Sequence, residues 1–149
     1  MDSLVPTRAW IAAEAMRELL HAQTEASDQE PCGVLLGRVE DRAVRIREVP
    51  ATPNVHPSPH RAFRIAPHDI LNAARAGRER GFTLLGFWHG HLEGLALAGE
   101  ADAEGLAAAE ALGPGARVLV VMGRGGGRAP VVRAYVSGEF GPREIPLAT

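Results

Sequence analysis

The sequence predicts an α/β (α+β) fold, a mixed central sheet flanked by helices, and three observations favour it. Residues 83–88 form a continuous apolar run, typical of a strand that is covered on both faces. A helical pattern at 67–80 separates this run from a shorter apolar segment at 63–65. Two further apolar runs follow at 118–122 and 131–136. With 149 residues, 46% of them hydrophobic, the chain has room for one core. Residues 1–149 are therefore expected to form a single domain.

The first part of the chain predicts a helix and then two strands. Residues 8–23 carry apolar side chains at helical spacing, namely Trp10, Ile11, Ala15, Leu19 and Leu20. Residues 33–37 are apolar between two glycines, which indicates a buried strand. In residues 42–49 the pair Val44 and Ile46 alternates with arginines, which predicts a strand with one packed face. A turn over residues 39–41 would join these two strands in a hairpin.

The second part predicts a functional loop and then alternating elements. Residues 50–60 are rich in proline and carry His56 and His60, which either contact a substrate or a metal or are ordinary solvated loop histidines. The elements expected after it are a short strand at 63–65, a helix at 67–80 with Ile70, Leu71, Ala74 and Arg78 inside, a strand at 83–88, a helix at 101–112, and strands at 118–122 and 131–136. Gly81 is expected to end the first of these helices, and the glycines at 125–127 to join the last two strands.

Composition excludes several classes of protein. A net charge of −2 and a pI near 6.3 give no general attraction to phosphate backbones, which disfavours nonspecific nucleic-acid binding. With Cys32 as the single cysteine, no internal disulfide or four-thiolate zinc site can form, and a cysteine that opens an apolar strand favours a buried, unreactive thiol. No stretch approaches the roughly 20 apolar residues of a membrane span, and the start lacks a secretion signal. We therefore expect an unprocessed cytoplasmic protein.

Two histidines and an aspartate form a candidate metal site. His89 and His91 stand two residues apart at the end of the 83–88 strand, so both side chains can project to the same side. Asp102 follows at the start of the expected alanine-rich helix, after a loop with glycines that can fold back toward the histidines. Three nitrogen and oxygen ligands leave a fourth position for water, the arrangement of a catalytic zinc site. The absence of a paired Pro-Cys-x-x-Cys excludes a zinc deaminase.

These residues, together with Glu30 and the segment Cys32-Gly33-Val34-Leu35-Leu36-Gly37, resemble the JAMM (MPN+) metalloproteases of small bacterial type. Asn54, Phe63, Pro67 and Gly86 also fall where that family tends to have such residues. The resemblance implies a layering like that of the cytidine deaminases and a zinc ion on His89, His91 and Asp102. It further implies that Glu30 is the general base of peptide or isopeptide hydrolysis, with a ubiquitin-like or sulfur-carrier protein as the partner.

The sequence departs from the family pattern at three places. Gly90 and Leu92 stand where the pattern His-Ser-His-Pro has serine and proline, and Gly99 stands where a serine precedes the aspartate. The second serine helps to hold the oxyanion, and the loss of one such donor costs on the order of 100- to 1,000-fold in turnover. A backbone N–H at Gly99 or Glu100 can partly replace it. The alternative is a non-catalytic MPN-like interaction module with weakened or lost activity, and a DNA-repair relative is disfavoured by the acidic balance.

Overall fold

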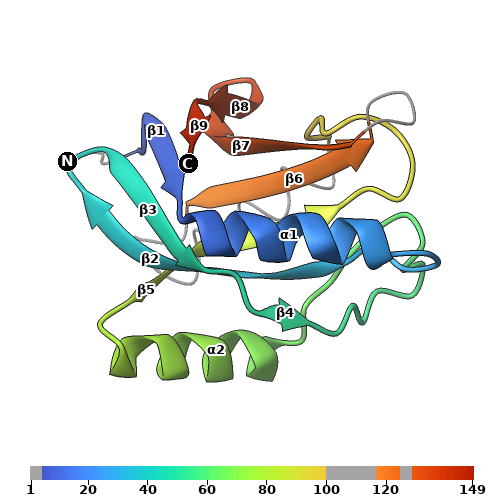
Figure 1. Ribbon diagram of the computed structural model, residues 1–149, viewed down its shortest axis with the longest axis horizontal. Coiled ribbons are helices and arrows are strands. Elements are labelled where there is room, and N and C mark those ends of the chain that lie inside the picture. Colours follow the sequence, from blue (N-terminus) through green and yellow to red (C-terminus); the bar gives the residue numbers. More distant parts are fainter. Residues whose placement is uncertain (1–4, 100–116, 125–128) are drawn as a thin grey trace.

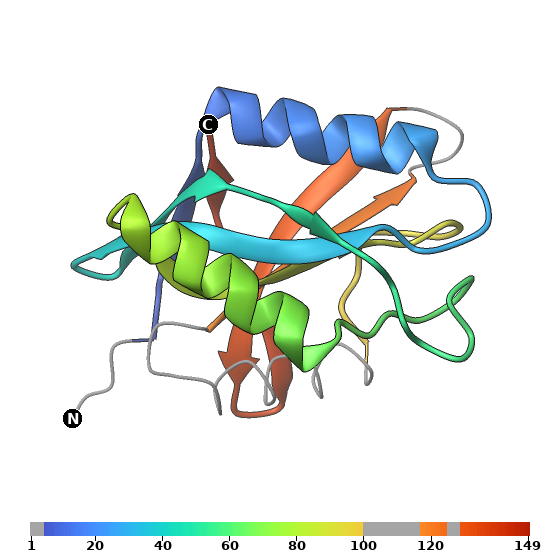
Figure 2. The ribbon, with the colours of Figure 1, turned by 90° about the horizontal axis from the view of Figure 1, so that it is seen from below.

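In the computed structural model, which describes residues 5–99, 117–124 and 129–149, two helices cover opposite faces of a mixed sheet (Figure 1). Helix α1 (Ala13–Glu25) lies on one face, and helix α2 (Pro67–Glu79) lies on the other (Figure 2). The predicted fold class, a mixed central sheet flanked by helices, is confirmed. No helix in the described part of the chain is long and apolar enough to cross a membrane.

The sheet brings together strands from both halves of the chain. Its strands are β1 (Arg8–Ile11), β2 (Cys32–Glu40), β3 (Ala43–Glu48), β4 (Ala51–Thr52), β5 (Thr83–Gly90), β6 (Val118–Arg124), β7 (Pro130–Gly138), β8 (Gly141–Ile145) and β9 (Leu147–Ala148). The order is β8-β7-β6-β5-β2-β3-β1-β9, with β4 paired to β2. Strand β5 pairs with β6 in parallel and with β2 in antiparallel orientation. The strand at 83–88 is therefore central, as its continuous apolar character predicts.

Alternating side chains build one apolar layer on each face of the sheet. The layer under α1 contains Leu35, Ile46, Leu85, Trp88, Val120 and Met122, and the layer under α2 contains Val34, Leu36, Phe87, Leu119, Val121 and Tyr135. In β6, for example, Val120 faces α1 whereas Leu119 and Val121 face α2, as the twofold period of a strand requires. Both faces of the central strands are thus removed from water.

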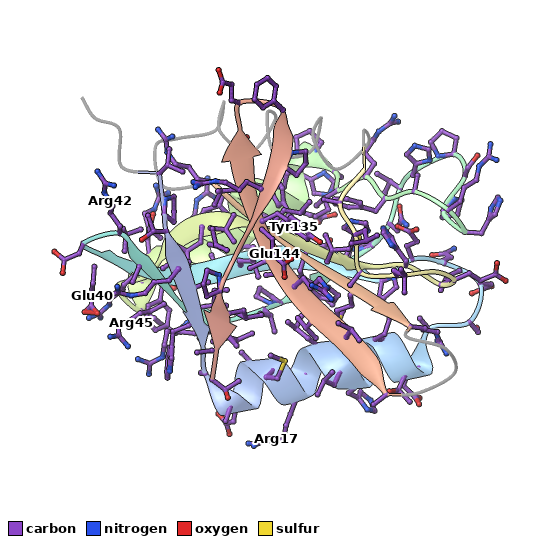
Figure 3. All side chains as sticks on the ribbon, turned by 90° about the horizontal axis from the view of Figure 1, so that it is seen from above. Arg17, Glu40, Arg42, Arg45, Tyr135 and Glu144 are labelled. Carbon is purple, nitrogen blue, oxygen red and sulfur yellow. The ribbon has the colours of Figure 1, made fainter. Side chains whose placement is uncertain are left out.

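Strands β2 and β3 form the predicted hairpin, with a turn slightly later than expected. Glu40 pairs with Ala43, and Asp41 in the turn has a φ of 56°, a left-handed conformation that aspartate tolerates. Glu40, Arg42 and Arg45 gather at this turn, and Arg45 forms an ion pair with Glu40 (Figure 3). Arg17 projects from α1 away from the sheet (Figure 3). These charges lie on the outer surface.

The expectation of one helix over residues 8–23 is wrong at its start. Residues 8–11 form strand β1, which pairs in parallel with both β3 and β9, and α1 begins only at Ala13. Ala9 and Ile11 are buried while Arg8 is exposed, so burial alternates with the twofold period of a strand. Trp10 and Ile11 also fit the helical spacing of the residues that follow, so the sequence pattern places the start of the helix too early. Strands β8 and β9 have no counterpart among the predicted elements.

The expected strand at 63–65 is also wrong, and the helix after it turns a different face inward. Residues 63–65 form an irregular segment in which Phe63 and Ile65 pack inward while Arg64 is exposed, and the amide of Val55 donates to the carbonyl oxygen of Arg64 at 2.9 Å. In α2 the inner residues are Ile70, Ala73 and Gly77, whereas Leu71 is 58% exposed. Gly81 has a φ of 81° and ends the helix as predicted.

Three loops converge at the end of the sheet opposite the β2–β3 turn (Figure 1). They are residues 26–31 after α1, residues 53–66 before α2 and residues 91–99 after β5. The helix expected at 101–112 and the glycine loop expected at 125–127 lie outside the described residues. The candidate site lies where the three loops meet.

Candidate metal centre

The end of β5 presents His89 and His91 on one side of the sheet. His89 pairs with Cys32 of β2 and with Val121 of β6, and it is buried. The amide of Gly90 donates to the carbonyl oxygen of Pro31 at 3.0 Å, and the amide of His91 donates to that of Met122 at 2.8 Å. The two imidazole centroids are 4.9 Å apart. The expectation that both rings project to the same side is confirmed.

Glu30 reaches the first of these histidines from the loop before β2. Its side chain is buried, and its Oε1 atom lies 3.0 Å from Nδ1 of His89. An ionised carboxylate only accepts hydrogen bonds, so Nδ1 of His89 is the donor in this contact. The amide of Glu30 donates to the carbonyl oxygen of Pro59 at 2.7 Å. Glu30 is therefore fixed both through its side chain and through its backbone.

Asn54 holds the loop that surrounds Glu30. Its Nδ2 atom donates to the carbonyl oxygens of Glu30 at 3.1 Å and Ala62 at 2.9 Å, and a longer contact of 3.4 Å reaches Pro59. Its Oδ1 atom accepts from the amides of His56 and Arg64, each at 3.1 Å. One half-buried side chain thus satisfies backbone groups that a loop would otherwise leave unpaired. Asn54 gives residues 53–64 a defined path past the site.

Phe63 packs on a face of the His89 ring. The two ring centroids are 4.3 Å apart and the planes differ by 17°, a stacked arrangement. The ring of His89 is therefore held by a carboxylate at its edge and by an aromatic ring on its face. This packing explains why Phe63 points inward although its segment is not a strand.

His91 is fixed in a similar way on the more exposed side of the site. Its Nδ1 atom lies 2.8 Å from the carbonyl oxygen of Leu95, which can only accept, so Nδ1 donates and Nε2 is left to coordinate. Histidines that bind metals usually donate their other N–H to a carboxylate or a backbone carbonyl. His89 and His91 both have such a partner.

A metal ion fits this set of donors. Ligand atoms of Glu30, His89 and His91 all lie within 4.8 Å of one another. Imidazole nitrogen and carboxylate oxygen are ligands that zinc accepts. Glu30 also belongs to the lining of a cavity of about 290 Å³ between residues 22–31 and 52–54.

The other residues singled out in the sequence have different positions. Asp102 lies outside the described residues, and Gly99 is exposed. His56 accepts a hydrogen bond from the amide of Ser58 at its Nδ1 atom, and His60 is exposed. Neither belongs to the donor cluster found among the described residues.

Cys32 is a buried thiol beside the cluster. Burial raises the pKa of Cys32 to about 11, against an opposing contribution from the hydroxyl of Thr52, and the charge of Glu30 raises it further. The thiol is therefore neutral at physiological pH and is not a nucleophile. This agrees with the interpretation of Cys32 as a small buried hydrophobic residue.

No sequence pattern indicates a functional role for Gln23, and Asn54 and Phe63 are indicated only as positions that match the family. Gln23 contacts the site across 68 residues of sequence, and Asn54 contacts Glu30 across 24. The signal for Asn54 is its place among prolines in a loop, where asparagine commonly bonds to nearby backbone. For Gln23 the only signal is a polar residue within the pattern of buried positions of α1.

The fold and this cluster define a small mixed-sheet domain with a His-x-His centre and a buried glutamate. The chain belongs to the family of prokaryotic homologs of the JAB domain, whose model matches residues 12–136. The resemblance to JAMM (MPN+) domains of small bacterial type is thereby confirmed.

Relatives and solved structures agree with this assignment. A protein of Thermus thermophilus, named a probable TtuB-protein conjugate cleaving protease, is 36% identical over 74 residues. The match covers 50% of this chain and 47% of that protein, so the chain spans about half the length of this relative. A solution structure of a Desulfitobacterium hafniense protein has a TM-score of 0.77 at 22% identity, covering 95% of this chain and 92% of the other. A Salinibacter ruber protein has a TM-score of 0.63 at 20% identity, covering 93% and 89%. These two structures share the fold.

Proposed function

We propose that this protein is a zinc-dependent peptidase or isopeptidase. The observation that carries the proposal is the cluster of Glu30, His89 and His91, in which each histidine has its Nδ1 atom held by an acceptor. In this proposal the Nε2 atoms of both rings are the metal ligands, and the carboxylate of Glu30 lies at the Nδ1 edge of the His89 ring. Membership of the JAB family and the protease name of the Thermus relative support the same activity.

In this proposal His89, His91 and Asp102 hold the zinc ion, and Glu30 is the general base. A bound zinc ion supplies a Lewis acid that polarises the scissile carbonyl and acidifies a water. Glu30 accepts the proton of the attacking water at its carboxylate and then delivers it to the departing amine. The bond with Nδ1 of His89 and the backbone contacts of Asn54 keep that carboxylate in place. Phe63 and the surrounding loops limit the water around His89.

The proposed substrate is a protein conjugate or fusion cleaved after the C-terminus of a ubiquitin-like or sulfur-carrier protein. The name of the Thermus relative describes cleavage of a protein conjugate, which supports this substrate class. An extended tail can bind such an enzyme by adding beside a strand.

Cleavage of a panel of carrier fusions tests this proposal. Each fusion joins a small ubiquitin-like or sulfur-carrier protein through its C-terminal glycines to a reporter, and release of the reporter is followed by electrophoresis and mass spectrometry. We expect at least one fusion to be cut directly after the carrier C-terminus with zinc present, and cleavage to stop on adding a chelator. If every fusion stays intact with the zinc-loaded protein, this substrate class is wrong.

A non-catalytic interaction module is the second candidate. Gly99 carries no side chain at the position of the family serine, and it is exposed. Such a module would keep the fold and the metal without turning over a substrate. The two candidates differ in their dependence on Glu30, because a module that only binds a partner does not require a base.

A further inference from the structure

Gln23 is a buried polar side chain that joins helix α1 to the metal centre. It lies in the last turn of α1 and is 0% exposed. Its Nε2 atom donates to the carbonyl oxygen of His91 at 2.7 Å. This bond crosses from the helix to the segment that carries both histidines. Breaking this bond would leave a buried amide without a partner, which is costly. The bond therefore holds the backbone of His91 in place.

The other atom of the Gln23 amide faces Gly90. Among the described residues Oε1 of Gln23 has no hydrogen-bond partner. Exchanging the amide nitrogen and oxygen would put two acceptors together at His91, so the assignment is fixed by chemistry. A Cβ atom added to Gly90 would overlap Oε1 and lie 2.9 Å from Cδ of Gln23. Gly90 therefore gives the glutamine the space that a side chain would otherwise fill.

A serine at residue 90, as in the family pattern, does not fit beside Gln23 in its observed position. Its Cβ would also come within 3.1 Å of Cγ of Pro31, so the space is closed from a second side. The backbone of Gln23 is held as well, because Nη2 of Arg124 donates to its carbonyl oxygen at 3.1 Å. The amide of Arg124 in turn donates to the carbonyl oxygen of Gly94 at 2.8 Å. The helix end has little freedom to move away from β5.

We propose that Gln23 is a positioning residue of the metal centre and that Gln23 and Gly90 form a matched pair. Gln23 holds the backbone of His91 so that its imidazole meets that of His89, and Gly90 is required because the amide occupies the side-chain space of that position. The role toward the metal rests on the proposed function. The coupling between the two residues does not, because it is a property of the metal-free protein.

Zinc affinity separates positioning from a general contribution to folding. Gln23→Met keeps the length of the side chain and removes its amide, whereas Leu19→Ala removes a buried apolar side chain from the same helix. Zinc dissociation constants are measured by competition with a chromophoric chelator, and stability by urea unfolding of the metal-free proteins. We expect Gln23→Met to weaken zinc binding about 10- to 100-fold. Leu19→Ala lowers the urea midpoint and leaves the dissociation constant within about twofold of the parent value.

A double-mutant cycle tests the matched pair without metal. Gly90→Ala, Gln23→Ala and the double variant are compared by urea unfolding. We expect Gly90→Ala to lower the urea midpoint strongly in the parent and much less in the Gln23→Ala background, where only the 3.1 Å contact of the methyl group with Cγ of Pro31 remains. Additive effects would overturn the pairing.

The outcomes distinguish this proposal from the proposed function. If the parent binds zinc and Gln23→Met binds it equally well, Gln23 does not position the centre, while the proposed function stands. If the parent binds no zinc, the proposed function fails and with it the role of Gln23 toward the metal. The double-mutant cycle still decides the coupling to Gly90 in that case.

Discussion

Glu30→Gln is expected to reduce hydrolysis by about 100- to 10,000-fold while zinc binding is retained, a range typical of the loss of a general base. The amide has the shape of the carboxylate and can keep a hydrogen bond to Nδ1 of His89, which lies 3.0 Å from Oε1 in the parent. It cannot accept and return a proton. The rate constant for cleavage of a carrier fusion, measured with the zinc content of the same sample, checks both halves of the prediction.

Glu18→Gln is the matched control, because Glu18 is an exposed glutamate on α1 away from the site. It makes the same chemical change and is expected to cleave at the parent rate. A Glu30→Gln variant that cleaves as fast as Glu18→Gln would contradict the role of Glu30 as the base. A variant that loses its zinc would instead place Glu30 among the ligands.

Gly86→Ala is expected to destabilise the fold by about 3–5 kcal/mol, the range of the most damaging single substitutions. Gly86 has a φ of 151°, and it pairs with Leu35 on one side and with Val118 on the other. A Cβ atom there would overlap the carbonyl oxygen of Val118 and lie 2.8 Å from its carbonyl carbon. The backbone of β5 or β6 must shift to relieve this contact. Urea unfolding of the metal-free protein measures the loss.

Gly141→Ala separates the steric effect from the backbone effect. Gly141 also has a positive φ, of 118°, but a Cβ atom there would meet nothing within 4 Å. This variant is expected to lose only about 1–2 kcal/mol, the usual cost of an unfavourable backbone conformation. If both variants lose the same free energy of unfolding, strands β5 and β6 can move apart at little cost to accommodate the Cβ atom at residue 86.

The central part of the fold could be predicted from local patterns. The runs at 33–37, 83–88 and 118–122 are apolar without interruption because both faces of those strands are covered by the layers under α1 and α2. Strand β1 could not be recognised in this way. Its four residues fit the helical period of the segment that follows, and its partners β3 and β9 are distant in the sequence. Tertiary pairing decides its structure.

In the candidate site, too, some residues could be predicted from local patterns and others only from the fold. His89 and His91 were predictable because residues two apart on a strand share a side, and the ring distance of 4.9 Å agrees. Glu30 drew attention only through the family pattern, since a loop carboxylate beside other acidic residues has no signal of its own. Gln23 and Asn54 act through backbone groups far along the chain. Only the fold shows those contacts.

Zinc content by native mass spectrometry tests the central claim most directly, with purified parent protein measured beside His89→Ala and Asp102→Asn. His68→Ala is the control, because His68 is exposed on α2 and lies apart from the cluster. We expect one zinc ion per chain in the parent and in the control, and markedly less in the other two variants. A parent protein that carries no zinc even after incubation with the metal would contradict the account.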